Sequence, residues 1–249
     1  MSNDEFCFSN PINHRKGKWN RLLHIPQSDP VYIQLEQQFH DGWKHPKKER
    51  PPPVQAVFKI LFSEESLEEY IQYRSKVAAT SFIFNLFSSN APNEQLLFHG
   101  TTRGCLLGED TNSVYLCDLP DCLLCNVIRN SFSVEKCGQT NKFRRFGCGI
   151  YITACSSKAD DYSKNTAKNA AFHVLLVNRV VVGKSYKTLH NATDMTEPPS
   201  GYHSVHGKPG ADLNYEETVV YNNDAIRPAY LLVFLIDTSA TLDNIFLTI

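Results

Sequence analysis

The strand-like segments of the second half of the chain limit its fold more than any other feature. Apolar, β-branched stretches occupy 96–100, 149–153, 170–183, 217–221 and 229–237, and turn residues separate them. Stretches of this length and composition are typical of β-strands. Since helical spacing is found before and between them, we predict an α+β domain with a mostly antiparallel sheet.

Helical spacing is clearest before residue 90. Residues 31–43 carry apolar side chains four positions apart, and Leu67, Tyr70, Tyr73 and Val77 mark one face of a second helix. Shorter helices are predicted over 119–132 and 156–164, and 54–62 fits either a strand or a short helix. The stretch 184–215 is rich in Pro and Gly, so we expect a long loop there.

The N-terminal part differs from the rest in composition. Residues 1–53 are polar and proline-rich, so we expect an extension that packs on one main domain over 54–249. The opening MSNDEFCFSN lacks the basic and apolar stretches of a secretory signal. No stretch has the length and hydropathy of a membrane span. We therefore expect an intracellular protein, cytoplasmic or nuclear and monomeric.

Three short motifs carry residues suited to ligand chemistry. They are Phe98-His99-Gly100-Thr101, then FGCGIY at 146–151 followed by SSKADDY at 156–162, and finally the pair Glu216-Glu217 before an apolar strand. Glycines let a ligand approach the backbone, and tyrosine rings can stack on a planar heterocycle. Each motif alone also fits an ordinary strand end, a core tyrosine or a solvated carboxylate.

Taken in this order, the motifs resemble the catalytic domain of the poly(ADP-ribose) polymerase family. That family carries a His, a Tyr and a Glu on separate strands around a nicotinamide pocket, and His99, Tyr151 and Glu217 match them here. The resemblance is clear from about residue 96 to 236. It implies the ADP-ribosyltransferase fold over 54–249, a split antiparallel β-sandwich with flanking helices.

The resemblance also implies a substrate and roles for the site residues. NAD would be cleaved at its nicotinamide–ribose bond, and ADP-ribose transferred to a protein acceptor as single units or short chains. His99 and Thr101 would contact the adenosine ribose, the Gly100 backbone the carboxamide, and Tyr151 and Tyr162 the nicotinamide ring. Glu217 would bind the nicotinamide ribose and stabilise its developing positive charge. Further contacts to NAD are expected from Ser157 and Arg145, with Lys142 and Arg144 as basic neighbours.

Departures from the family pattern leave alternatives open. Ala159 stands where the family has a serine that holds the nicotinamide amide. The residues before His99 are too few for the regulatory helical bundle of the DNA-dependent members, and the net charge is −1, so activation by DNA is not expected. The same residues would serve an NAD glycohydrolase. The remaining alternative is a catalytically inactive module that binds ADP-ribose or a partner protein.

Seven of the eight cysteines lie between residues 105 and 155. Cys117, Cys122, Cys125 and Cys137 have spacings near those of a structural zinc site. Cys122 and Cys125 are also three residues apart in a predicted helix, where both can face the core. We therefore favour buried thiols over zinc from the sequence alone.

Overall fold

Two long antiparallel strands form the centre of the fold. In the computed structural model, β7 (Phe172–Val181) pairs with β11 (Ile226–Leu235) over most of their length. The structure describes residues 22–46, 48, 50–62, 64–84, 93–112, 114–138 and 143–235. Both strands are rich in Val, Leu and Phe and are almost fully buried, as expected for a sheet covered on both faces.

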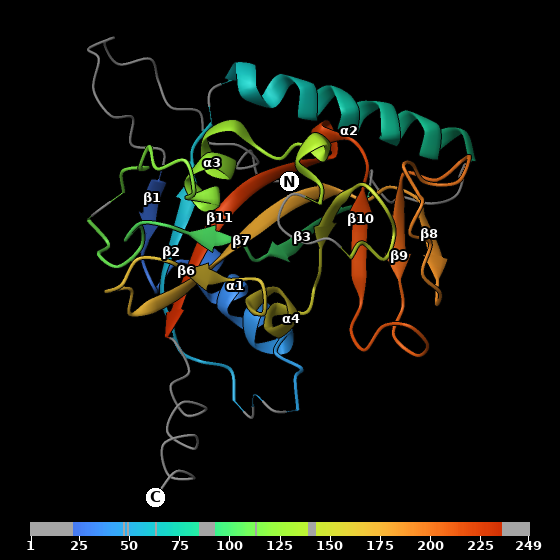
Figure 1. The fold of residues 1–249 in the computed structure, drawn as a ribbon. Coiled ribbons are helices and arrows are strands. Elements are labelled where there is room, and N and C mark those ends of the chain that lie inside the picture. Colours follow the sequence, from blue (N-terminus) through green and yellow to red (C-terminus); the bar gives the residue numbers. More distant parts are fainter. Residues whose placement is uncertain are drawn as a thin grey trace, which may run out of the picture.

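Three further strands complete the sheet that contains β7 and β11, and four others form a second sheet (Figure 1). The five-stranded sheet has the order β1-β2-β11-β7-β3, and the four-stranded sheet has the order β5-β10-β9-β8. A short parallel pair joins β4 and β6. The additional strands are β1 (Leu22–Ile25), β2 (Val54–Ile60), β3 (Glu94–His99), β4 (Thr102–Arg103), β5 (Ile150–Ile152), β6 (Lys164–Asn165), β8 (Ser185–Thr188), β9 (Ser204–Gly207) and β10 (Glu217–Val220).

Helices cover both faces of the five-stranded sheet. On one face lies α1 (Pro30–Asp41), which begins at the cap Asp29 and buries Tyr32, Leu35 and Phe39. The other face packs against α2 (Glu64–Phe84) and α3 (Leu123–Asn130). A single-turn α4 (Ser156–Asp160) and two 3₁₀ turns, Val134–Lys136 and Asn223–Ala225, complete the elements.

The observed architecture confirms the predicted α+β class and the split, mostly antiparallel sandwich. The segment 54–62, which fitted either a strand or a helix, forms β2. The prediction of one long loop over 184–215 is wrong, because β8 and β9 lie within it and pair in parallel. Each of these strands has only four residues, and much of their composition is polar, so the strand pattern was hidden.

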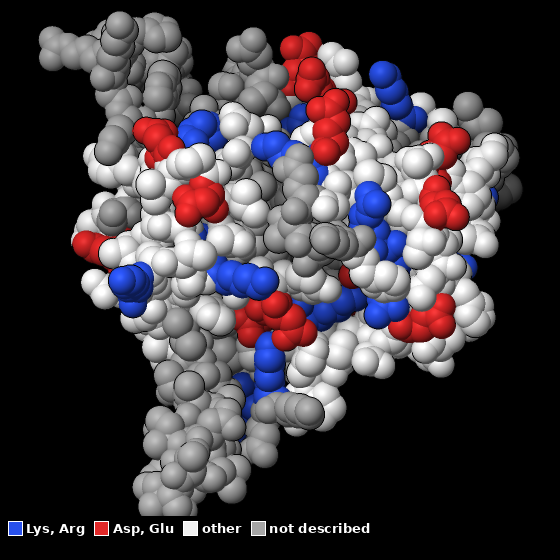
Figure 2. All heavy atoms as spheres, viewed as in Figure 1, with Lys and Arg blue, Asp and Glu red and all other residues white. Residues whose placement is uncertain are grey.

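The N-terminal segment is integrated into the fold where the structure describes it. β1 pairs with β2 at the edge of the sheet, and α1 contributes to the core beneath β7 and β11. The division at residue 53 stays a prediction. Among the described residues, no helix is both long and apolar enough to cross a membrane. On the face shown in Figure 2, acidic and basic side chains are interspersed.

Candidate active site

The end of β3 and the strand β5 meet where the two sheets come together. Phe98 and Thr153 exchange two backbone hydrogen bonds, N–H to oxygen, of 2.8 and 3.1 Å. The next residue, His99, places its ring Nδ1 2.9 Å from the carbonyl oxygen of Tyr151. β5 in turn pairs with β10, which carries Glu217. Three strands far apart in the sequence therefore bring His99, Tyr151 and Glu217 into one region.

The geometry around His99 sets its protonation. A carbonyl oxygen only accepts hydrogen bonds, so the proton lies on Nδ1 and the Nε2 atom is an acceptor. Burial lowers the pKa of His99 below its ordinary value, which favours the neutral ring. The ring of Phe132 meets the imidazole edge-on, with centroids 5.0 Å apart. His99 is thus a fixed, uncharged acceptor.

The Tyr151 side chain is held through its hydroxyl group. Its hydroxyl donates to the Gly147 carbonyl at 2.8 Å and accepts from the Phe146 N–H at 3.0 Å. Burial raises the pKa of Tyr151, and the negative charge of Glu217 adds to this. Gly147 has φ +66°, and a Cβ there would overlap the Met195 backbone, which explains the glycine at this turn. The ring of Tyr151 is therefore presented in one orientation.

The structure separates the two candidate glutamates. Glu217 is only 8% exposed, and its Oε1 lies 2.9 Å from the Lys158 ammonium. The neighbouring Glu216 carboxylate lies 3.8 Å from Nε2 of His206 instead. Lys158 also lies 3.3 Å from the carbonyl oxygens of Tyr215 and Glu216. Sequence reasoning missed Lys158, although it is the third residue of the SSKADDY motif.

Gly100 packs directly against α4. A Cβ at this position would overlap the carbonyl oxygen of Ala159, so no larger residue fits without movement of the backbone. The following residue, Thr101, is half-buried, and its carbonyl accepts from the Lys164 N–H at 3.3 Å. The chain after His99 is therefore fixed between α4 and β6.

Tyr162 follows α4 and is 45% exposed. Partial burial of the side chain raises the pKa of the Tyr162 hydroxyl, and the negative charge of Glu217 acts in the same direction. The positive charge of Arg145 acts in the opposite direction and lowers the pKa of Tyr162, so Arg145 lies in the same region as Tyr162. The guanidinium of Arg145 bonds to the Asp212 carbonyl at 2.9 Å and to Asn191 Oδ1 at 3.2 Å. Lys142 lies outside the described residues.

Ser157 faces the N-terminal segment. Its hydroxyl is fully buried and accepts from the backbone N–H groups of Lys44 and His45 at 2.9 and 3.2 Å. The His45 ring reaches the same hydroxyl through Nδ1 at 2.7 Å and Asp161 through Nε2 at 3.1 Å, and it stacks on Tyr215 at 4.1 Å. These contacts hold α4 against the loop segment that leads to Glu217.

Lys48 also attaches the N-terminal segment to the end of α4. Its ammonium lies 2.7 Å from Asp160 and 2.9 Å from Asp161. Although burial disfavours the charge, these two carboxylates raise the pKa of Lys48 above its ordinary value. Neither His45 nor Lys48 stood out in the sequence, because their partners lie more than a hundred residues away.

The cysteine cluster differs from the predicted one by one member. Cys117, Cys122 and Cys125 come together, but the fourth sulfur is that of Cys105. The predicted fourth member, Cys137, instead points its sulfur at the Gly147 carbonyl, 3.7 Å away. The choice of Cys137 was therefore wrong, because sequence spacing did not show that the chain after β4 folds back onto α3.

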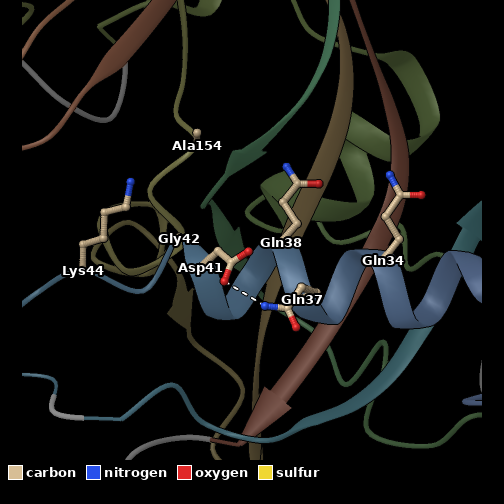
Figure 3. Close-up of a pocket in the computed structure, with 7 residues that line it drawn as sticks. All are labelled: Gln34, Gln37, Gln38, Asp41, Gly42, Lys44 and Ala154. Atoms are coloured by element: carbon tan, nitrogen blue, oxygen red, sulfur yellow. Dashed lines mark hydrogen bonds between the residues drawn. The ribbon is translucent and has the colours of Figure 1, made fainter.

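A shallow hollow of about 440 Å³ lies along α1 (Figure 3). Gln34, Gln37, Gln38 and Asp41 line it from the helix, and Gly42, Lys44 and Ala154 complete it. Gln37 and Asp41 bond to each other, and Gln38 donates to the Leu96 carbonyl. None of the predicted site residues lines this hollow.

Comparison with known proteins bears on the predicted family resemblance. Residues 123–211 match the poly(ADP-ribose) polymerase catalytic domain. The human protein mono-ADP-ribosyltransferase PARP4 is 26% identical over 203 residues, which cover 74% of this chain and 11% of that protein. Mouse PARP4 is 28% identical over 219 residues, 86% of this chain and 9% of the relative. The chain thus spans about a tenth of the length of these relatives. The comparisons confirm the predicted resemblance of this chain to the catalytic domain of the poly(ADP-ribose) polymerase family.

Proposed function

We propose that this domain cleaves the nicotinamide–ribose bond of NAD and transfers the ADP-ribose to a protein acceptor. The observation that carries the proposal is the convergence of His99, Tyr151 and Glu217 from three strands, with Glu217 ionically paired to Lys158. A neutral acceptor, an oriented aromatic ring and a fixed carboxylate are the groups that this reaction needs.

Each group has a defined task in the proposed reaction. Nε2 of His99 accepts from an adenosine-ribose hydroxyl, and the Gly100 backbone binds the carboxamide. The rings of Tyr151 and Tyr162 hold the nicotinamide between them. As the bond between the ribose carbon and the nicotinamide nitrogen breaks, its electron pair leaves with nicotinamide. The Glu217 carboxylate stabilises the positive charge left on the ribose.

Two further contacts complete the proposed site. Arg145 lies in the neighbourhood of Tyr162, where its charge can meet the pyrophosphate of NAD. Ser157 supports the site by fixing α4, since its hydroxyl already binds the segment around His45. The PARP4 relatives are named mono-ADP-ribosyltransferases, which favours transfer of single units over chains. The acceptor is proposed to be a protein side chain.

The test compares adjacent glutamates. The purified protein, Glu217→Gln and Glu216→Gln are incubated with NAD, and nicotinamide, free ADP-ribose and protein-bound ADP-ribose are separated by chromatography. Loss of the transition-state contact should slow nicotinamide release by roughly a hundred-fold or more in Glu217→Gln. Glu216→Gln should retain activity, because its carboxylate faces His206.

The products distinguish the possible reactions. Label on protein supports transfer, whereas free ADP-ribose alone indicates an NAD glycohydrolase on the same domain. Nicotinamide release that does not exceed background, or that is equal in wild type and Glu217→Gln, would contradict catalysis and leave a binding module.

A further inference from the structure

Four cysteine sulfurs meet beside the sheet, outside the proposed NAD site. Cys105 follows β4, Cys117 lies in the next segment, and Cys122 and Cys125 lie at the start of α3. All four sulfurs lie within 4.8 Å of one another. Cys105 is 3.6 Å from Cys125 and 3.7 Å from Cys122, sulfur to sulfur.

These distances match those of thiolates around one metal ion. Zinc binds thiolate sulfur at about 2.3 Å, so two sulfurs at the corners of a tetrahedron are about 3.8 Å apart. A disulfide would need a separation near 2.05 Å. We propose that Cys105, Cys117, Cys122 and Cys125 bind a structural zinc ion.

The surroundings favour a closed site over a catalytic one. Cys122 and Cys125 are fully buried, whereas Cys105 and Cys117 are half-buried. With four protein sulfurs, the coordination of a tetrahedral ion is complete, and no position stays open for water or substrate. Such a set is typical of zinc ions that stabilise folding.

The two segments of the cluster approach each other closely at Gly104. A Cβ at Gly104 would approach the Cys122 Cβ to 3.3 Å, so glycine lets the two segments come close.

The zinc would anchor a helix that bears on the NAD site. α3 has only eight residues, and no side-chain hydrogen bond caps its N-terminus at Cys122. A helix this short is not stable without tertiary contacts. Its far end leads to Phe132, which packs edge-on against His99. Cys105 also lies six residues after His99, so the ion would fix both segments next to that histidine.

The experiment measures metal content, which does not depend on activity. The full chain is produced with zinc in the medium and analysed by elemental mass spectrometry, alongside Cys105→Ser and the matched control Cys137→Ser. We expect one zinc per chain in the wild type and in Cys137→Ser. In Cys105→Ser, zinc affinity measured by competition with a chromophoric chelator should fall by about a hundred-fold or more.

Cobalt substitution of the wild type provides an independent measure if Cys105→Ser does not fold. Four thiolates should give the thiolate-to-cobalt charge-transfer and strong visible bands of a tetrahedral Co²⁺ site. Zinc well below one per chain with freely reactive thiols, an octahedral cobalt spectrum, or equal zinc loss in both variants would overturn the proposal. So would a disulfide within the cluster in the protein as purified.

Discussion

The Lys158 ammonium lies 2.9 Å from Oε1 of Glu217, and the two side chains are 13% and 10% exposed. α4 supplies the lysine and β10 the glutamate, so the pair joins the two halves of the proposed site. Removing one member of a nearly buried ion pair leaves the other without compensation. The lysine therefore fixes the position and the charge of the proposed catalytic carboxylate.

Lys158→Met should lower kcat more than it changes the affinity for NAD. The methionine keeps an apolar side chain of similar length but removes the contact to Glu217. A hydrogen bond between charged groups contributes about 1.5–3 kcal/mol, which corresponds to a loss of roughly 10- to 100-fold in kcat. Steady-state release of nicotinamide measures the change.

Lys164→Met is the matched control for this effect. Lys164 is exposed and lies on β6, a few residues beyond α4. Its replacement should leave kcat within about two-fold, as for most exposed charges. If Lys158→Met retained wild-type kcat while the thermal unfolding midpoint was unchanged, the lysine would have no role in positioning Glu217.

Gly100→Ala should weaken NAD binding and destabilise the domain. The new methyl group would overlap the Ala159 carbonyl, so the β3 end and α4 would have to separate. Such overpacking costs about 1–3 kcal/mol. Urea unfolding measures this cost, and KM for NAD should rise because the contact to the carboxamide moves.

Gly201→Ala is the control for Gly100→Ala. Nothing lies within 4 Å of the Cβ position of Gly201, so the methyl group strains only the backbone φ of +81°. KM for NAD should therefore stay unchanged in this variant.

The sequence predicted what depends on local composition and on motif order. Strands such as β7 and β11 were found because they are long and β-branched, whereas β8 and β9 were missed because they are short and partly polar. His99, Tyr151 and Glu217 were predicted from the order of the motifs, and the structure brings them into one region. The partner of Glu217 was missed, because its pairing is formed only when α4 folds against β10. Cys105 was missed for the same reason: no spacing rule links it to α3.

His45→Ala should destabilise α4 and reduce activity through that helix. The ring bonds to Ser157 and Asp161 and stacks on Tyr215. Losing these contacts should cost about 1–3 kcal/mol in the free energy of unfolding. His190→Ala, at a residue whose side chain is 76% exposed, should cost far less.

Ser157→Ala, made alone and together with His45→Ala, tests whether the serine acts by holding the segment around His45 or by direct contact with NAD. Because both residues share one hydrogen-bond network, their effects on stability should be less than additive. His45→Ala retains the backbone N–H groups of Lys44 and His45 that bind the Ser157 hydroxyl, so a serine that acts only by holding α4 should raise KM for NAD in the double variant only together with a further loss of stability. A rise of KM without a further loss of stability would instead support direct contact between Ser157 and NAD.

The stability of the domain should decline as the pH falls below about 6.5, and His99 should account for part of the decline. Burial lowers the pKa of His99 in the folded state, so the unfolded chain binds the proton more readily. Stability is then full above the unfolded value near 6.5 and is lost as the pH falls towards the folded pKa. His203 and His206 have pKa values lowered by burial as well, so they contribute with the same sign.

His99→Gln tests the contribution of His99, because its amide can still donate to the Tyr151 carbonyl. Urea unfolding between pH 7 and 5 should show that the free energy of unfolding falls less steeply with decreasing pH in this variant than in the wild type. An unchanged dependence of the unfolding free energy on pH would mean that burial does not keep His99 neutral. The proposed role of its Nε2 as an acceptor for the ribose hydroxyl would then be wrong as well.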